Sequence, residues 1–196
     1  MTGPARPISY ATADQARAYV GGLVRGPADA PVYLIASPAV RKGDRWARWT
    51  AELEKLLPGL RLTSWRELPE SLTGVPADER PGRLARTLRG AIVVPDKHRD
   101  RRWIGCVAAA EARAFADVGR PVLVYADGRL TAWPDCRVVE GQADAPKFTP
   151  IEILVPAEAP RMLPTLDASL RVLGHAPATS TPGPVPFRPP AKAAVR

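Results

Sequence analysis

The sequence predicts an α/β fold: a doubly wound, mostly parallel Rossmann or flavodoxin-like sheet with helices on both faces. Short apolar runs typical of fully buried strands occur at residues 31–36, 91–94 and 122–125. Segments with helical periodicity separate these runs, and the joints between helix and strand are short. Strands that alternate with helices in this way favour parallel crossover units over a sheet of hairpins.

The first half of the chain contributes three helices and three strands to this prediction. Thr12 can cap the first helix, and Pro58-Gly59 ends the second, in which Trp46, Trp49 and Leu53 recur at helical spacing. The chain between the second strand and the third helix, residues 66–78, is expected to be irregular. The expected elements are helices at 13–24, 43 or 44 to 57 and 81–89, and strands at 31–36, 60–65 and 91–94.

The second half is organised around one helix, expected at 104–118. This segment is rich in alanine and has no internal proline. Gly119 can adopt the left-handed conformation that ends a helix, and Pro121 prevents the helix from resuming. The elements expected after it are a strand at 122–125, a turn at 127–128, a small hairpin or edge strand within 129–139, and an edge strand at 148–155.

The predicted elements form one domain, residues 12–160. A short C-terminal helix or extension is expected at 161–173. Residues 1–11 and the proline-rich tail, residues 174–196, contain few core-forming side chains, so both are expected to be disordered.

Composition limits the class of protein. The 196 residues carry a net charge of +8, which is compatible with nucleic acid and with small phosphorylated ligands. No apolar run reaches the roughly 20 residues of a membrane span, and no signal peptide pattern opens the chain. The two cysteines cannot build a disulfide framework, so we expect a reduced, cytoplasmic protein.

Glu111 breaks the apolar pattern of the central helix. At 100° per residue it lies about 20° from Ile104 and about 40° from Phe115, within the apolar stripe. A carboxylate there faces the sheet, where ionisation is costly unless the group has partners or opens onto a cleft. Two interpretations stay open: a structural glutamate paired with an arginine, and a positioned catalytic carboxylate.

Two basic loops are expected close to that helix. Ligands of doubly wound sheets bind beyond the carboxyl ends of the strands, where the strand order reverses. The loops at residues 37–44 and 95–102 follow the first and third strands, both carry net positive charge, and the second leads into the helix of Glu111. Arginines beside helix N-termini suit a phosphate, although a solvated basic surface is the alternative.

These residues resemble a known family. A buried strand closing in Ser37-Pro38 looks like the opening of nucleoside 2-deoxyribosyltransferases and the related deoxynucleoside-monophosphate N-glycosidases, and Glu111 keeps their eight-residue spacing to a Gly-Lys-Pro-Val motif, here Gly119-Arg120-Pro121-Val122. The similarity covers about residues 31 to 126. It implies that Glu111 is a nucleophile that attacks C1′ of a nucleoside sugar, expels the base and forms a glycosyl-enzyme ester. By position it also implies that Tyr33 and Gly105 contact the substrate.

The chemistry of this reaction assigns further roles. An N-glycosidic bond breaks through an oxocarbenium-like centre, which a carboxylate stabilises or traps. A second acid must protonate the departing base, and Asp96, Asp100 and His98 are the candidates close in sequence. No metal or other cofactor is required. The groups expected to hold a 5′-phosphate are Ser37, Arg41 or Lys42.

The chain departs from the family pattern just before the glutamate. Val107-Ala108 stand where the family has Gly-Thr, and Gly105 stands where it often has an aspartate. The alternative is therefore a non-catalytic protein that binds nucleotide or nucleic acid on the same fold. The expected partner is a nucleoside, nucleotide or dinucleotide, with nucleic acid as a further candidate for the basic surface. No membrane partner is expected, and a homodimer stays open.

Overall fold

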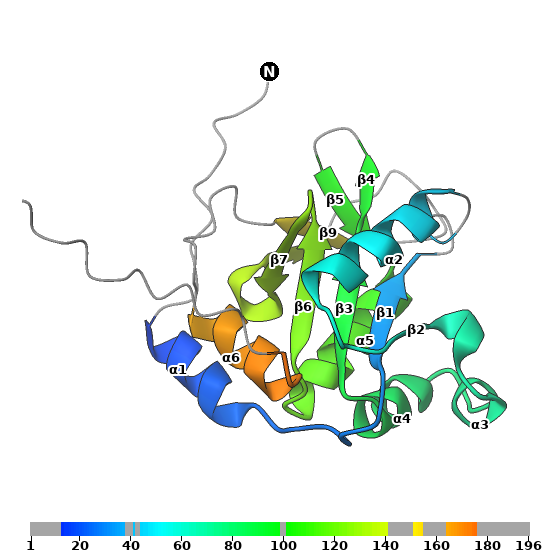
Figure 1. The fold of residues 1–196 in the computed structure, drawn as a ribbon, viewed down its shortest axis with the longest axis horizontal. Helices are drawn as coiled ribbons and strands as arrows, with labels where there is room; N and C mark the ends of the chain where they lie inside the picture. Colours follow the sequence, from blue (N-terminus) through cyan, green and yellow to red (C-terminus); the bar gives the residue numbers. More distant parts are fainter. Residues whose placement is uncertain are drawn as a thin grey trace, which may run out of the picture.

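The protein, described here as a computed structural model, is an α/β structure with a mostly parallel five-stranded central sheet (Figure 1). The structure describes residues 13–37, 41, 44–98, 101–140, 151–154 and 164–175. The N-terminal segment 1–11, expected to be disordered, lies outside these residues, and so does the expected disordered tail 174–196 apart from Gly174 and His175. None of the described helices is both long and apolar enough to cross a membrane.

The central sheet has the strand order β2-β1-β3-β6-β7. Its first four strands run parallel, and β7 pairs antiparallel with β6 across the turn at Asp127 and Gly128, as the turn dipeptide predicted. The chain adds β2 on one side of β1 and β3 on the other, so the strand order reverses between β1 and β3. The strands are β1 (Val32–Ala36), β2 (Leu62–Ser64), β3 (Gly90–Val94), β6 (Val122–Ala126) and β7 (Arg129–Ala132).

Helices pack on both faces of this sheet. Side chains alternate along a strand, so Tyr33 and Ile35 of β1 face one core and Val32 and Leu34 face the other. The first core lies against α4 and α5, and the second lies against α2 and α6. The helices are α1 (Ala13–Gly22), α2 (Asp44–Leu56), α3 (Glu70–Thr73), α4 (Arg80–Thr87), α5 (Cys106–Asp117) and α6 (Pro164–Val172), with short 3-10 helices η1 (Trp65–Glu67) and η2 (Trp133–Asp135).

The end of α5 confirms the predicted stop signal. Gly119 has a φ of +72°, the left-handed region that glycine enters without steric cost. A Cβ at this position would lie 2.3 Å from the carbonyl oxygen of Gly22, so the close approach of the N-terminal segment also requires glycine. The chain then enters β6 after two residues, which gives the short helix-to-strand joint expected from the sequence.

The predicted basic loop at 95–102 was wrong in its local structure. Its described residues form most of a hairpin, β4 (Asp96–His98) and β5 (Arg101–Ile104), so α5 begins at Cys106 rather than at residue 104. The hairpin belongs to a second, antiparallel sheet of order β4-β5-β9-β8, completed by β8 (Arg137–Glu140) and β9 (Ile151–Leu154). Pairing with a strand about fifty residues later stabilises β5, and such a long-range contact leaves no local sequence signal.

Candidate functional site

Glu111 is buried against the central sheet, as its place in the apolar stripe predicted. Only 5% of the residue is exposed to solvent. The hydroxyl of Tyr33, on β1, donates a hydrogen bond to Oε2 of Glu111 over 3.4 Å. The Tyr33 ring in turn stacks on Phe115, one turn further along α5, with 6.3 Å between the ring centroids. The carboxyl group is thus held between β1 and the buried face of its own helix, α5.

A pocket of about 310 Å³ opens beside the Glu111 carboxyl group. Its walls come from the end of β1, the start of η1 after β2, and the N-terminal ends of α4 and α5. All of these lie at the carboxyl edge of the parallel strands, next to the position where the strand order reverses. The lining residues are Ala36, Ser37, Arg41, Trp65, Arg80, Gly105, Cys106, Val107, Ala108 and Glu111. We call this cavity the Glu111 pocket.

Burial controls the charge of Glu111. Desolvation raises the pKa of its carboxyl group to about 7, against the lowering effects of Arg41, the Tyr33 hydrogen bond and Arg80. The same burial, together with the carboxylate, raises the pKa of the Tyr33 hydroxyl, which stays protonated and able to donate. No ion pair joins Glu111 to a described residue. The interpretation of Glu111 as the structural partner of an arginine is therefore not supported by an ion pair among these residues.

Arg41 enters the pocket from the loop after β1. Its Nε donates to the carbonyl oxygen of Ala36 over 2.7 Å, and its backbone N–H donates to the carbonyl of Ser37 over 3.1 Å. These two bonds tie Arg41 to the end of β1. They position the guanidinium group at the carboxyl end of β1, where it lowers the pKa of Glu111 by its charge.

Arg80 and Trp65 are pocket residues that the sequence interpretation missed. The Arg80 guanidinium lies over the Trp65 ring, with Cζ 4.9 Å from the ring centroid, and its Nη2 donates to the carbonyl of Val75 over 3.1 Å. Its Nε is buried and makes no hydrogen bond to a described residue. A signal existed for both residues. Trp65 directly follows β2, and Arg80 opens the helix before β3, so both belong to the edge of the sheet that the switch-point rule selects.

The structure brings together part of the predicted site. Ser37, Arg41 and Gly105 line the pocket with Glu111, and Tyr33 lies behind the carboxyl group. Asp96 lies in β4 and is not among the lining residues. His98 ends β4, but the placement of its side chain is outside what the structure describes, and Lys42 and Asp100 lie outside the described residues altogether.

The described lining residues define what the pocket can do chemically. They offer one carboxyl group that ionises near pH 7, two guanidinium groups and the hydroxyl of Ser37. Glu111 is the only carboxylic acid among them, and Cys106 adds a thiol. Within the described parts of the chain, no three histidine, cysteine or acidic side chains are grouped so that they could hold a metal ion. Such a site suits an anionic ligand with a reacting centre beside the carboxylate.

Comparisons with known proteins identify no relative of this chain. No protein-family model, curated protein or solved structure matches the chain. The chemistry of the pocket therefore has to be decided from its own residues.

Proposed function

We propose that the protein cleaves the N-glycosidic bond of a nucleoside or nucleotide, with Glu111 as the nucleophile. The observation that carries this proposal is the convergence of a buried carboxyl group with Ser37 and Arg41 in one pocket. These residues come from separate parts of the chain. Ser37 and Glu111 belong to the segments that resemble deoxyribosyltransferases and N-glycosidases, and Arg41 follows Ser37 in the basic loop expected to hold a phosphate.

The fold supports the same proposal at a coarser level. We infer a doubly wound, flavodoxin-like organisation from the parallel order β2-β1-β3-β6 and from the helices on both faces. In such sheets the crevice at the reversal of strand order is the usual ligand site, and the Glu111 pocket lies at that edge. The fold alone would fit many activities, so the reaction is argued from the pocket residues.

The proposed reaction proceeds in two displacements. The Glu111 carboxylate attacks C1′ of the sugar, the bond from C1′ to the base nitrogen breaks, and its electron pair leaves with the base, which takes up one proton from a water molecule in the pocket. The product is a glycosyl ester of Glu111. Water then attacks C1′, loses a proton and releases the sugar, which restores the carboxylate; a second base in place of water would make the reaction a transfer.

The arginines indicate an anionic substrate. Arg41 and Arg80 lie on the walls of the pocket, and the buried Nε of Arg80 is a donor without an acceptor among the described residues. A charged guanidinium forms its strongest hydrogen bonds to phosphate or carboxylate oxygens. The volume of about 310 Å³ is at the small end of ligand pockets, which fits one nucleoside or nucleotide rather than a polymer.

Base release from a panel of substrates tests the proposal. We expect wild type to release free base from at least one 2′-deoxynucleoside, its 5′-monophosphate or a dinucleotide such as NAD, detected by chromatography. Glu111→Gln should lower the rate by about a hundredfold or more, because a positioned catalytic group contributes on that scale. Glu54→Gln, the same change at an exposed site on α2, should leave the rate unchanged. Equal release by the Glu111→Gln and Glu54→Gln proteins would contradict the proposal.

A second candidate is a non-catalytic nucleotide-binding protein. It is favoured by the missing second acid, since Glu111 is the only carboxylate among the described residues of the pocket. Calorimetry with the same compounds separates the two functions. Saturable binding of a nucleotide without base release, weakened by Arg80→Ala, would support this candidate over the enzyme.

A further inference from the structure

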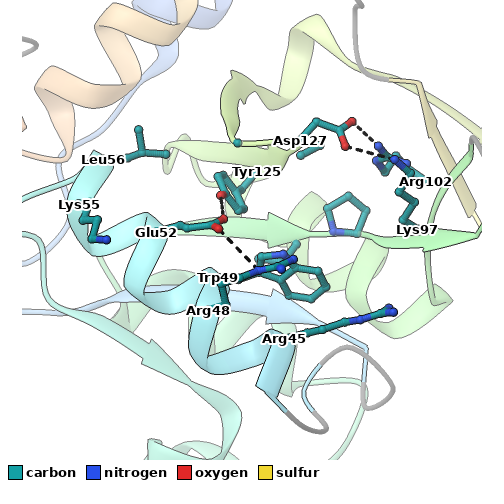
Figure 2. A pocket seen from close by; sticks show the side chains of 14 residues that line it. Arg45, Arg48, Trp49, Glu52, Lys55, Leu56, Lys97, Arg102, Tyr125 and Asp127 are labelled. Carbon is teal, nitrogen blue, oxygen red and sulfur yellow. Dashed lines mark hydrogen bonds and ion pairs between the residues drawn. The ribbon is translucent and has the colours of Figure 1, made fainter.

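A second and larger cavity lies on the opposite face of the central sheet. It occupies about 910 Å³ between α2 and the carboxyl ends of β3 and β6 (Figure 2). We call it the basic groove and define it by its lining residues, which are Arg45, Arg48, Trp49, Glu52, Lys55, Leu56, Val94, Pro95, Lys97, Arg102, Tyr125, Ala126, Asp127 and Gly128. It shares no residue with the Glu111 pocket.

Positive charge lies on both walls of the basic groove. Arg45, Arg48 and Lys55 project from α2, and Figure 2 shows Lys97 and Arg102 on the other side, beside Asp127. Arg45 and Lys55 are ten positions apart on α2, a rise of about 15 Å along the helix axis, so the cations are spread along the groove. A row of cations opposite a second pair suits an extended polyanion better than one isolated phosphate.

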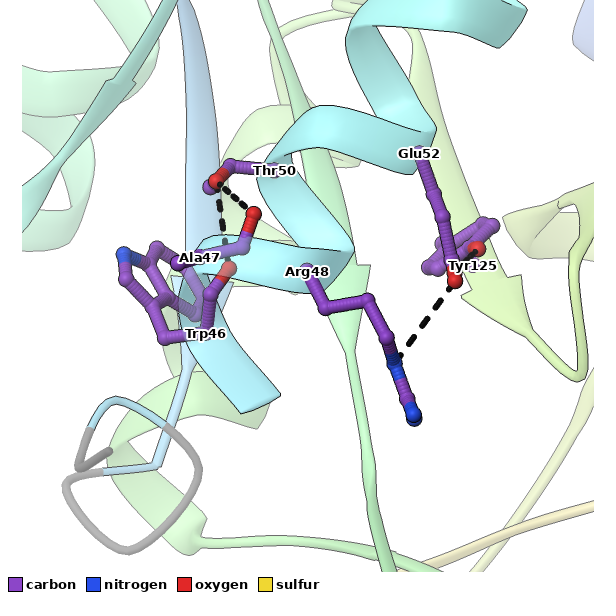
Figure 3. Close-up of polar contacts among 6 residues, drawn as sticks. All are labelled: Trp46, Ala47, Arg48, Thr50, Glu52 and Tyr125. Atoms are coloured by element: carbon purple, nitrogen blue, oxygen red, sulfur yellow. Dashed lines mark hydrogen bonds and ion pairs between the residues drawn. The ribbon is translucent and has the colours of Figure 1, made fainter. Parts of the chain in front are cut away.

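The two acids of the basic groove are already engaged. Glu52 accepts a hydrogen bond from the hydroxyl of Tyr125, on β6, and lies 3.7 Å from the Nε of Arg48 (Figure 3). Asp127 pairs with Arg102, and its Oδ1 lies 3.6 Å from the Nζ of Lys97.

The remaining cations are available to a ligand. Arg45 and Lys55 are exposed and make no ion pair with a described residue. Five cations against two carboxylates leave a net charge of +3 in the groove.

One aromatic side chain accompanies these charges. Trp49 lines the groove and is only partly buried, although its inner side packs against the core beneath α2. Figure 2 shows its ring between α2 and the strands, beside the cationic side chains. An indole that is accessible in a cationic groove offers a stacking surface to a nucleic acid base.

We propose that the basic groove binds single-stranded nucleic acid. Proteins that hold single strands combine a positive groove, which follows the phosphate backbone, with aromatic side chains on which bases stack. The basic groove has both features, and the net charge of +8 for the whole chain acts in the same direction. This binding is separate from the proposed function, because the two cavities share no residue and differ in the length of ligand they suit.

Fluorescence anisotropy of a labelled oligodeoxythymidylate of about twelve nucleotides tests the proposal. Wild type should bind, and its affinity should fall roughly tenfold or more between about 50 and 200 mM salt, as expected when three or more phosphates are neutralised. Arg45→Glu/Lys55→Glu should bind at least tenfold more weakly than Arg83→Glu/Arg86→Glu. The second variant makes the same change of charge at exposed positions of α4, away from the groove, and serves as the control.

Several outcomes would overturn the proposal. Equal loss in the two double variants would mean that only overall charge matters. Tighter binding of a duplex of the same length, or full competition by a mononucleotide, would assign the groove a different ligand. Glu111→Gln should bind the oligonucleotide like wild type, and Arg45→Glu/Lys55→Glu should release base like wild type, so failure of either proposal leaves the other testable. Circular dichroism confirms that the variants are folded.

Discussion

The Glu111 pocket and the basic groove lie at the same edge of one sheet, but they shift the pKa of a carboxyl group in opposite directions. In the pocket, burial raises the pKa of Glu111 to about 7, and the nearby arginines only partly offset the desolvation. In the groove, the hydrogen bond and charge of Arg102, together with Lys97, hold the pKa of Asp127 below its ordinary value and outweigh the desolvation of a side chain that is 54% exposed. Side chains of the same chemical class therefore acquire different properties from their surroundings alone.

This difference separates two kinds of functional surface. A desolvated carboxyl group destabilises the folded protein. Such a group is therefore expected at a reactive site, where its chemistry is needed. Exposed cations cost little, since water hydrates them, and they act on ligands through forces that salt screens. We therefore expect substitutions at the pocket to affect stability and pH dependence, and substitutions at the groove to affect salt-dependent binding.

The largest effect on stability is expected at Phe115, which packs against the hydrogen-bond partner of Glu111. Phe115 is fully buried and stacks on Tyr33, so Phe115→Ala should lower the free energy of unfolding by about 3–5 kcal/mol. Phe115→Leu keeps most of the volume and should cost clearly less. Denaturant unfolding measures both. A cost below about 1 kcal/mol for Phe115→Ala would mean that the pocket is less tightly packed than the structure shows.

A smaller effect is expected at the edge of the basic groove. Asp127→Asn removes the pairing with Arg102 while keeping a side chain that tolerates the φ of +51° at this position. Because the pairing lowers the pKa of Asp127, its stabilisation is present at neutral pH and is lost as the carboxylate is protonated in acid.

For a pair this exposed we expect the variant to lose no more than about 1 kcal/mol at pH 7. The difference from wild type should disappear at an acid pH below the pKa of the folded carboxylate, which itself lies below the ordinary value of 3.8. Thermal melts at the two pH values measure it. A difference that persists unchanged in acid would mean that Asp127 acts through the turn and not through its charge.

Local patterns predicted the parts of the fold that depend on local physics. The apolar stripe of the central helix located Glu111 on the buried face, and Gly119 with Pro121 marked the joint to β6, because helical periodicity and left-handed glycine act within a few residues. The strand ends at β1 and β3 then selected the edge of the sheet that carries the pocket.

Long-range contacts explain what the sequence did not predict. The run from Asp96 to Ile104 is too charged to indicate strands, and its described residues form β4 and β5 because the two pair with each other and β5 pairs with β9. Arg80 enters the pocket from a helix about thirty residues before Glu111, held by its position over Trp65. Neither contact produces a regular spacing of residues in the sequence from which it could be predicted.

The pH dependence of stability in Glu111→Gln tests most directly whether burial alone controls this residue. A pKa raised above its ordinary value destabilises the folded protein as pH rises from the ordinary pKa to the folded one. The variant should therefore match wild type near pH 4.5 and exceed it at pH 8, by about 3 kcal/mol in the free energy of unfolding if the folded pKa is about 7. Urea unfolding of both proteins at the two pH values gives the comparison. A variant that is several kcal/mol less stable than wild type at pH 8 would instead show that Glu111 is a structural partner of an arginine, and would contradict the account.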